Sequence, residues 1–230
     1  MVDPDPRSPA LEPARLAAAR GDVYAFLGEQ WLLPPIRDDQ PLEALAARWG
    51  AVGLGVDEAR GERIVRFLEE TDSVIEALEA EYQALLRVPT GRYLTPVQSV
   101  YEAAAFEDDS WTFGRLRTKP WTEVTAAYAH AGYAVSPGDQ VEADHIGCML
   151  EFMAALCREE SQAWADGHPE RVNELRTAQA SFLDRHFDGW LSKLRLRLDQ
   201  THELPYYPDV MGMLETYVKV EAKHLPRHGT

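Results

Sequence analysis

The chain has 230 residues and carries 23 Lys and Arg against 38 Asp and Glu, a formal net charge of −15 at pH 7. With 45% hydrophobic and 27% charged residues, the composition allows a sizeable core and excludes wholesale disorder. A surface this acidic repels phosphate, which excludes a sequence-reading nucleic-acid binder and plain adhesion to anionic membranes. The charge favours a basic or cationic partner instead.

Apolar residues recur at helical spacing along most of the chain, and proline or glycine separates the segments. Residues 1–12 are proline-rich and are interpreted as a disordered leader. The acidic outer face of the longest segment is interpreted as a solvated surface. In chain order, helices are predicted over 13–33, 41–49, 57–87, 96–106, 122–133, 142–165, 170–198 with a bend near Gly189, and 205–223.

Three segments are predicted to lie outside helices. Gly50, Gly53 and Gly55 indicate a linker, residues 107–120 an acidic and aromatic loop, and residues 224–230 a loose tail. Period-2 alternation is almost absent. The sequence therefore predicts an all-α fold, a single-domain helical bundle of roughly eight to ten helices over 13–223.

Signatures of a metal, a catalytic set or a cofactor are absent from the sequence. None of the seven histidines pairs with another at helical i,i+4 spacing or with a Cys-x-x-Cys motif, and there is no phosphate loop. Cys148 and Cys157 occupy apolar helical positions, which indicates inert thiols in a reduced compartment. We therefore predict no catalytic residues, no metal and no cofactor.

Targeting signals are also absent. The N-terminal residues lack a basic region followed by an apolar stretch, so no secretory signal is predicted. No run of about eighteen apolar residues is present, so no membrane-spanning helix is predicted. These features predict a cytoplasmic protein with no stable membrane insertion and no nucleic-acid partner.

One segment places polar residues at the start of a strongly apolar helix. Glu142, Asp144 and His145 directly precede it. The first interpretation is capping, with Asp144 as N-cap of that helix and Glu142 favouring its positive end. The alternative is that Asp144 and His145 present charge and hydrogen-bonding capacity at a groove.

A second segment joins a helix end to the start of the next helix. Considered alone, it is most often core followed by a helix opening, because proline and serine are common at helix starts. Its notable residues are Tyr82, Leu85, Leu86, Pro96, Ser99 and Tyr101.

Taken together, these segments resemble the TorD/DmsD family of cytoplasmic chaperones that mature molybdenum oxidoreductases. Tyr82, Leu85 and Leu86 are similar to that family's aromatic-x-x-Leu-Phe helix end. The stretch 96–101 is similar to its Pro-x-x-Ser-Val-aromatic motif. The stretch 142–147 matches its Glu-x-x-Asp-His core.

Two later motifs extend the resemblance over about residues 15–220. His186, Phe187 and Trp190 resemble the family's His-aliphatic-x-x-Trp helix, and Tyr206 and Tyr207 resemble its closing helix. Two features differ from the family pattern. Position 143 is Ala where the family often has Pro or Glu, and the loop 107–120 is longer and more aromatic.

The resemblance implies a chaperone, not an enzyme. Such proteins bind the N-terminal signal of a molybdopterin enzyme's catalytic subunit, often a twin-arginine signal, delay its export and assist cofactor insertion. A chaperone of this kind is expected to be a monomer or a domain-swapped dimer. The implied peptide-binding residues are Tyr82, Leu85, Leu86, Pro96, Ser99, Tyr101, Glu142, Asp144 and His145.

A twin-arginine signal is chemically compatible with these residues. Its arginines can pair with a carboxylate such as Asp144, and its apolar part can enter an apolar groove. Substitution of Asp144 or His145 by Ala is therefore expected to weaken peptide binding without changing the melting temperature. Unfolding of both variants would favour capping.

Two other functions remain open from the sequence. One is a helical scaffold or regulator without signal-peptide specificity. The other is a metal-dependent helical enzyme that uses His145, Glu142 and Glu151, for which the only motivation is that acidic residues and a histidine cluster there.

Overall fold

The computed structural model describes residues 11–89, 91–134 and 141–226. Within them the chain forms ten α-helices, one π-helical turn and one small hairpin, which confirms the predicted all-α class. The elements are α1 (Leu11–Leu32), α2 (Leu42–Val56), α3 (Glu58–Glu70), α4 (Val74–Tyr82), η1 (Gln83–Arg87), α5 (Gln98–Glu102), β1 (Ala105–Glu107), β2 (Ser110–Thr112), α6 (Lys119–His130), α7 (Ile146–Ala165), α8 (Pro169–His186), α9 (Trp190–Asp199) and α10 (Tyr206–His224).

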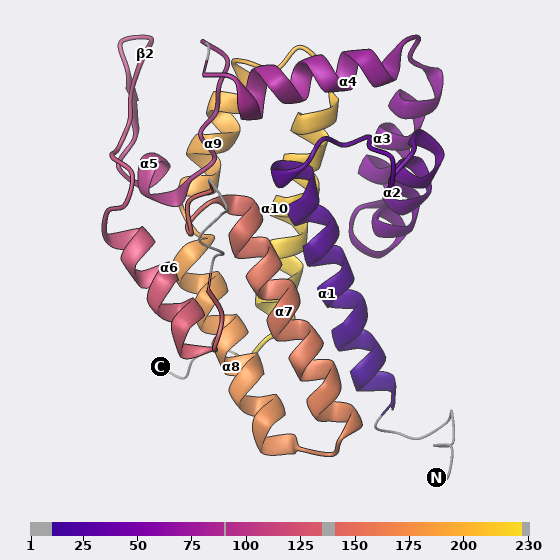
Figure 1. Ribbon diagram of the computed structural model, residues 1–230, viewed down its shortest axis with the longest axis vertical. Helices are drawn as coiled ribbons and strands as arrows, with labels where there is room; N and C mark the ends of the chain where they lie inside the picture. Colours follow the sequence, from indigo (N-terminus) through magenta and orange to yellow (C-terminus); the bar gives the residue numbers. More distant parts are fainter. Residues whose placement is uncertain (1–10, 90, 135–140, 227–230) are drawn as a thin grey trace.

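Four long helices run along the long axis of the molecule, as Figure 1 shows. Helices α1 and α7 form the most extensive contact, and α8 and α10 complete the bundle. The close approach of α1 to α7 depends on two glycines of α1. A Cβ on Gly21 would lie 3.2 Å from the carbonyl oxygen of Ala154, and one on Gly28 would lie 3.2 Å from that of Gly147.

The shorter helices cover one end and one side of this bundle. Helices α2, α3 and α4 lie at the end where α10 begins, and α3 packs on α10 (Figure 1). Helix α5 packs against α6 and α9. A continuous core joins them, and its largest fully buried side chains include Tyr24, Trp31, Trp49, Tyr101 and Trp190.

The predicted glycine linker and the predicted helix over 57–87 are both wrong in part. Gly50, Gly53 and Gly55 lie inside α2, and a bend at Asp57 separates α2 from α3. The following segment is broken after Glu70, where Ser73 takes a left-handed conformation with φ 52°. Apolar periodicity continues across both turns, which is why the pattern alone did not reveal them.

Three further boundaries differ from or refine the prediction. Helix α1 begins at Leu11, while residues 1–10 of the predicted leader lie outside the described residues. Helix α10 extends to His224 and Leu225 is buried, so these two tail residues belong to the fold, and 227–230 lie outside the described residues. The predicted bend at Gly189 is confirmed as a break with φ 79°.

The segment after α5 is a hairpin instead of a helix end and a loop. Strands β1 and β2 pair antiparallel, with Phe106 opposite Trp111. Asp108 and Asp109 form the two-residue turn, and both have positive φ, as a type I′ hairpin turn requires. Within the described residues, no helix combines the length and apolar character needed to cross a bilayer.

Candidate functional site

The two polar segments singled out in the sequence meet in the structure. The amide of Gln98 donates to the carbonyl of Asp144 at 2.9 Å, and the amide of Ile146 donates to the carbonyl of Pro96 at 2.9 Å. Val97 and His145 form an antiparallel bridge between these bonds. The start of α5 and the start of α7 are therefore held together, although Gln98 and Ile146 are 48 positions apart in the sequence. We call this contact the α5–α7 junction.

Asp144 is at the centre of the α5–α7 junction and is fully buried. Its Oδ2 accepts a hydrogen bond from the amide of Ser99 at 2.8 Å, so its carboxylate caps α5. The prediction that Asp144 caps the helix that follows it is wrong, because the N-cap of α7 is His145. Helix α5 needs this partner, since its own N-cap residue, Val97, has no polar side chain.

The environment of Asp144 disfavours the charged form of its carboxyl group. Burial raises the pKa of this carboxyl group, and the hydrogen bond from the Ser99 amide offsets only part of the effect. Within the described part of the chain, its second oxygen, Oδ1, has no hydrogen-bond partner. The Ser99 hydroxyl is likewise buried and unpaired there. Burying the Asp144 carboxylate therefore costs free energy, and the capping bond from the Ser99 amide offsets part of that cost.

His145 is partly buried and neutral at pH 7. Its Nδ1 accepts a hydrogen bond from the amide of Gly147 at 3.1 Å, which requires that nitrogen to be unprotonated. Burial lowers the pKa of His145 to about 4, in agreement with this role. The imidazole serves as the N-cap of α7 and carries no charge toward a ligand at neutral pH.

Glu142 is the carboxylate of this segment that solvent can reach. Its side chain is one-fifth exposed and pairs with Arg117, whose Nε lies 2.9 Å from Oε2 of Glu142. Arg117 itself is 68% exposed, so the pair is a surface ion pair of small energy. An incoming cationic group could therefore replace Arg117 at little cost.

The third motif segment is connected to the junction through Leu94. The Leu94 amide donates to the carbonyl of Leu85 at 2.9 Å, and the carbonyl of Leu94 accepts a hydrogen bond from the Tyr101 hydroxyl. Tyr82 anchors the same turn to α1, because its hydroxyl donates to the carbonyl of Leu32 at 3.1 Å. Three segments far apart in sequence thus form one connected framework.

Most of the nine predicted peptide-binding residues lie inside this framework. Only Glu142 and His145 are partly exposed. The buried members can shape and position a binding surface, whereas direct contact with a peptide stays a prediction. The buried ones are Tyr82, Leu85, Leu86, Pro96, Ser99, Tyr101 and Asp144.

Contacts from the α8–α9 region complete the framework. The ring Nδ1 of His186 lies 3.1 Å from Oε1 of Gln98, and Nε1 of Trp190 donates to the carbonyl of His186 at 2.7 Å. Lys193 caps the other end of α5 through bonds of 2.9 and 2.8 Å to the carbonyls of Glu102 and Ala104. Sequence reasoning missed Gln98 and Lys193, because a polar residue at a helix start or on an amphipathic helix carries no signal of its distant partner.

The framework offers no metal-binding geometry. Among the described residues, no group of three or more His, Cys, Asp or Glu side chains could hold a metal ion. The alternative enzyme hypothesis uses His145, Glu142 and Glu151, and the structure links the first two by a backbone bond from the amide of His145 to the carbonyl of Glu142 at 3.0 Å. Nδ1 of His145 is, however, engaged by the amide of Gly147, and both carboxylate oxygens of Glu142 are engaged by Arg117. The arrangement suits binding or positioning better than catalysis.

Comparison with known proteins gives a consistent set of matches. The sequence model of the family described as "Nitrate reductase delta subunit" matches residues 55–195. The chain is 31% identical to a selenate reductase assembly chaperone protein of Thauera selenatis over 156 residues, 67% of this chain and 75% of that protein. It is 30% identical to a chlorate reductase assembly chaperone protein of Ideonella dechloratans over 144 residues, 62% and 69% of the two chains. A chaperone protein TorD of Vibrio parahaemolyticus is 25% identical over 112 residues, 49% of this chain and 51% of that one.

Proposed function

The chain belongs to the nitrate reductase delta subunit family of TorD-like molybdoenzyme maturation chaperones, and we propose that it binds the N-terminal signal of one reductase catalytic subunit. The family and the matched relatives are assembly chaperones and not catalysts. The client is a molybdopterin oxidoreductase subunit whose signal is of the twin-arginine type. The chaperone acts in the cytoplasm, delays export and assists cofactor insertion before the client folds around its cofactor.

The observation that carries this proposal is the α5–α7 junction. It joins the motif segments of α5 and α7 at one buried carboxylate, and the α4–η1 segment is connected to α5 through Leu94 and Tyr101. Glu142, which precedes Asp144 by two positions in the sequence, pairs with an exposed arginine, its one ion-pair partner among the described residues. An arginine of the signal can take the place of Arg117, because both present the same guanidinium group to a carboxylate. The buried members of the set hold the helices that carry this surface.

Calorimetric titration with a synthetic twin-arginine signal peptide tests the proposal. We expect a dissociation constant below ~100 μM, a weak limit for a specific complex. No binding at that concentration would overturn the proposal. In the native cell, capture of the tagged chain should recover one large molybdoenzyme subunit, whereas a general scaffold would recover an assortment of proteins.

Two substitutions distinguish a residue that contacts the peptide from a residue that positions the helices. Glu142→Ala should weaken peptide binding several-fold and leave the melting temperature nearly unchanged, because its ion pair with Arg117 is exposed. Asp144→Ala should lower the free energy of unfolding by about 1–3 kcal/mol, because α5 loses its cap and the Ser99 amide stays buried. Denaturant titration and calorimetry measure the two effects. Glu107→Ala, on the exposed hairpin, is the control.

A further inference from the structure

A second surface of the molecule is hollowed and apolar, and the sequence motifs do not predict it. Helices α8, α9 and α10 enclose a groove of about 540 Å³. Its floor is formed by Leu183, Phe187, Leu191 and Leu225, each of which is nearly fully buried. This volume lies in the range of sites that take small ligands or a few side chains. We call it the α8–α10 groove.

Acidic side chains border this apolar floor. Asp184 and Asp188 are exposed on the rim, and within the described residues neither takes part in an ion pair. Across the groove, Glu215 lies 3.8 Å from Arg195, and Lys219 is the one basic side chain among the described lining residues. Asp184 and Asp188 therefore have no cationic partner in the described part of the chain, and they stand beside an apolar floor.

The α8–α10 groove adjoins the framework of the α5–α7 junction. At the break between α8 and α9, neighbouring residues contact different sites: some contact the α5–α7 junction and others line the groove. His186 and Trp190 contact Gln98 and Tyr101 on the junction side, while Phe187 and Leu191 line the groove. The break at Gly189 therefore borders both sites, and a ligand in the groove would lie against Phe187 and Leu191, the sequence neighbours of residues that contact α5.

We propose that the α8–α10 groove holds the apolar segment of the client's signal peptide, with Asp184 and Asp188 receiving basic residues that flank it. The inference rests on the proposed function and assigns a place to the peptide. A segment with an apolar face and flanking arginines is complementary to an apolar floor with an acidic rim. Tyr82, Leu85 and Leu86 lie within the core, whereas the lining of this groove also includes apolar residues that solvent reaches, Ala180, Val218 and Ala222.

The peptide is expected to bind with an apolar face against Leu183, Phe187 and Leu191, as amphipathic helices bind in grooves. Carboxylates at the rim add specificity for arginine and speed encounter, because charge-assisted hydrogen bonds form at the edge of the contact. A peptide with an acidic flank would be repelled by the same rim. The groove therefore discriminates by charge as well as by hydrophobicity.

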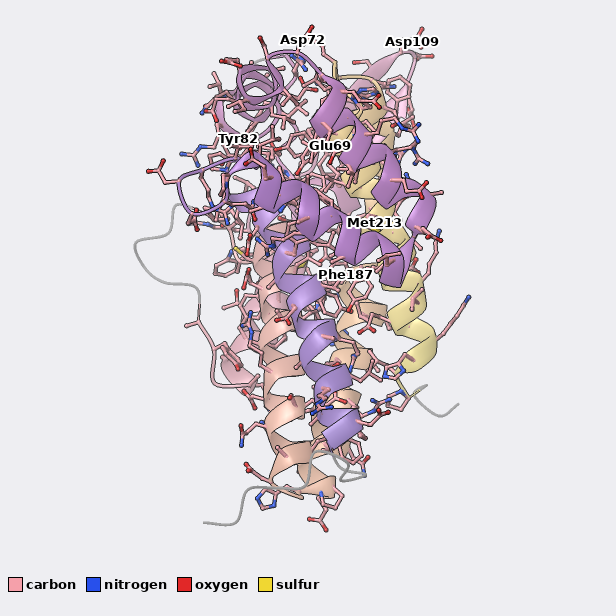
Figure 2. All side chains as sticks on the ribbon, turned by 90° about the vertical axis from the view of Figure 1, so that its right-hand side faces the viewer. Glu69, Asp72, Tyr82, Asp109, Phe187 and Met213 are labelled. Carbon is pink, nitrogen blue, oxygen red and sulfur yellow. The ribbon has the colours of Figure 1, made fainter. Side chains whose placement is uncertain are left out.

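The probe for the test is a fluorescein-labelled synthetic twin-arginine signal peptide, measured by anisotropy against the full chain. Ala222→Trp narrows the groove from an exposed position on α10, and Ala47→Trp on α2 is its control. The double reversal Asp184→Lys/Asp188→Lys changes the rim. Glu69→Lys/Glu70→Lys, which changes the net charge equally on α3, is the matched control. Figure 2 labels Glu69 and the groove residue Phe187 at different heights along the long axis.

We expect Ala222→Trp and the rim reversal each to weaken binding by about tenfold or more, and both controls to stay within about threefold. A second probe with both arginines replaced by glutamine should lose most of its dependence on the rim reversal, which a double-mutant cycle measures. Circular dichroism melting checks that each variant is folded. A photo-crosslinking residue in the apolar segment of the peptide should label α8, α9 or α10.

The possible outcomes distinguish failure of the proposed peptide site in the groove from failure of the proposed chaperone function. Failure of the unaltered chain to bind the probe overturns both. Binding that all groove variants retain, with crosslinks to other helices, overturns the groove alone and leaves the chaperone function intact. A change in oligomeric state with Ala222→Trp, seen by sedimentation without loss of peptide affinity, would identify the groove as a contact between copies and also overturn the proposal.

Discussion

Arg20 is a charged residue at the centre of the helical bundle. Its guanidinium lies 2.8 Å from Oε2 of Glu160 and 2.7 Å from Oε2 of Glu221, and it donates to Gln179 at 2.5 Å. All four side chains are almost fully buried. Burial by itself would raise the pKa of Glu160, but the hydrogen bond from Gln179 and the charge of Arg20 outweigh it and lower that pKa.

Replacing Arg20 should strongly destabilise the chain. Arg20→Met leaves the carboxylates of Glu160 and Glu221 buried with fewer partners, so the free energy of unfolding should fall by roughly 3–5 kcal/mol. Urea denaturation measures the change. Arg171→Met removes exposed pairs with Glu159 and Glu174, and should cost less than about 1 kcal/mol. Equal effects of the two variants would contradict this account.

His186 makes stability depend on pH. Burial chiefly lowers its pKa to about 4, while an unfolded histidine titrates near 6.5. Between these values the unfolded chain binds more protons, so stability is full above about pH 6.5 and is lost as the pH falls toward 4. His145 shifts in the same direction and contributes in the same window.

Substitution of His186 should therefore flatten the pH profile. The slope due to one such group is at most about 1.4 kcal/mol per pH unit, so His186→Gln should remove a measurable part of the loss between pH 6.5 and 4. Denaturant titrations at several pH values give the profile. The exposed His130→Gln is the control and should keep the original slope. An unchanged slope in His186→Gln would show that another group is responsible.

Helices α2 and α3 cross at a pair of glycines. A Cβ added to Gly61 would lie 2.6 Å from the Cα of Gly53, and one added to Gly53 would lie 2.8 Å from the Cα of Gly61. Both contacts are to backbone, which cannot move aside without separating the helices. Small residues here let the two backbones touch. Of the three glycines that indicated a linker in the sequence, Gly53 therefore serves a helix crossing.

Gly61→Ala should force α2 and α3 apart. We expect a loss of roughly 1–3 kcal/mol in the free energy of unfolding, the range for overpacking in a tight core. Gly55→Ala is a matched control, because a Cβ there meets nothing within 4 Å. That change should stabilise the chain by up to about 1 kcal/mol, since alanine favours the helix. Chemical denaturation of both variants checks the opposite signs.

The π-helical turn η1 shows how a motif acts at the scale of an element. It ends α4, and its carbonyls at Gln83 and Leu85 accept bonds from Val88 and Leu94. Leu94 then reaches Tyr101 of α5. A π-turn inside a helix often marks a functional region. Here it directs the chain from α4 to the α5–α7 junction.

The negative charge of the whole molecule affects the rate at which a charged partner associates with it. The formal charge of −15 is spread over the solvated face of α3 and α4 as well as the rim of the α8–α10 groove. Charges of one sign speed encounter with a cationic peptide and add little to the final contact. They also repel phosphate and other anions.

Salt should therefore slow peptide binding. Raising NaCl from about 20 mM to about 500 mM shortens the screening length severalfold, and the association rate should fall by about tenfold. Stopped-flow fluorescence with the labelled twin-arginine peptide measures it, while the dissociation rate should change less. A probe with its arginines replaced by glutamine is the control and should show little salt dependence. A salt-independent rate for the original probe would exclude electrostatic attraction.

Much of the fold could be predicted because helix formation has a local signal. The apolar period of α7 and α10 and the break at Gly189 are visible in adjacent residues. The turn at Ser73 was missed because the apolar pattern runs through it. The hairpin was missed because each of its strands is only three residues long. At the α5–α7 junction, the sequence motifs named segments that the structure brings together, but the role of Asp144 was assigned to the wrong helix.

By itself, the sequence determined the helical class, the family resemblance and the acidic charge. Composition, periodicity and motif order are properties of the linear sequence and do not depend on tertiary contacts. Only the tertiary structure decided that Asp144 caps α5, that Arg20 meets Glu160 and Glu221, and that Leu183, Phe187 and Leu225 share one groove. These contacts join residues far apart along the chain. A helical pattern shows which face is buried, but the partner of that face depends on how the helices pack.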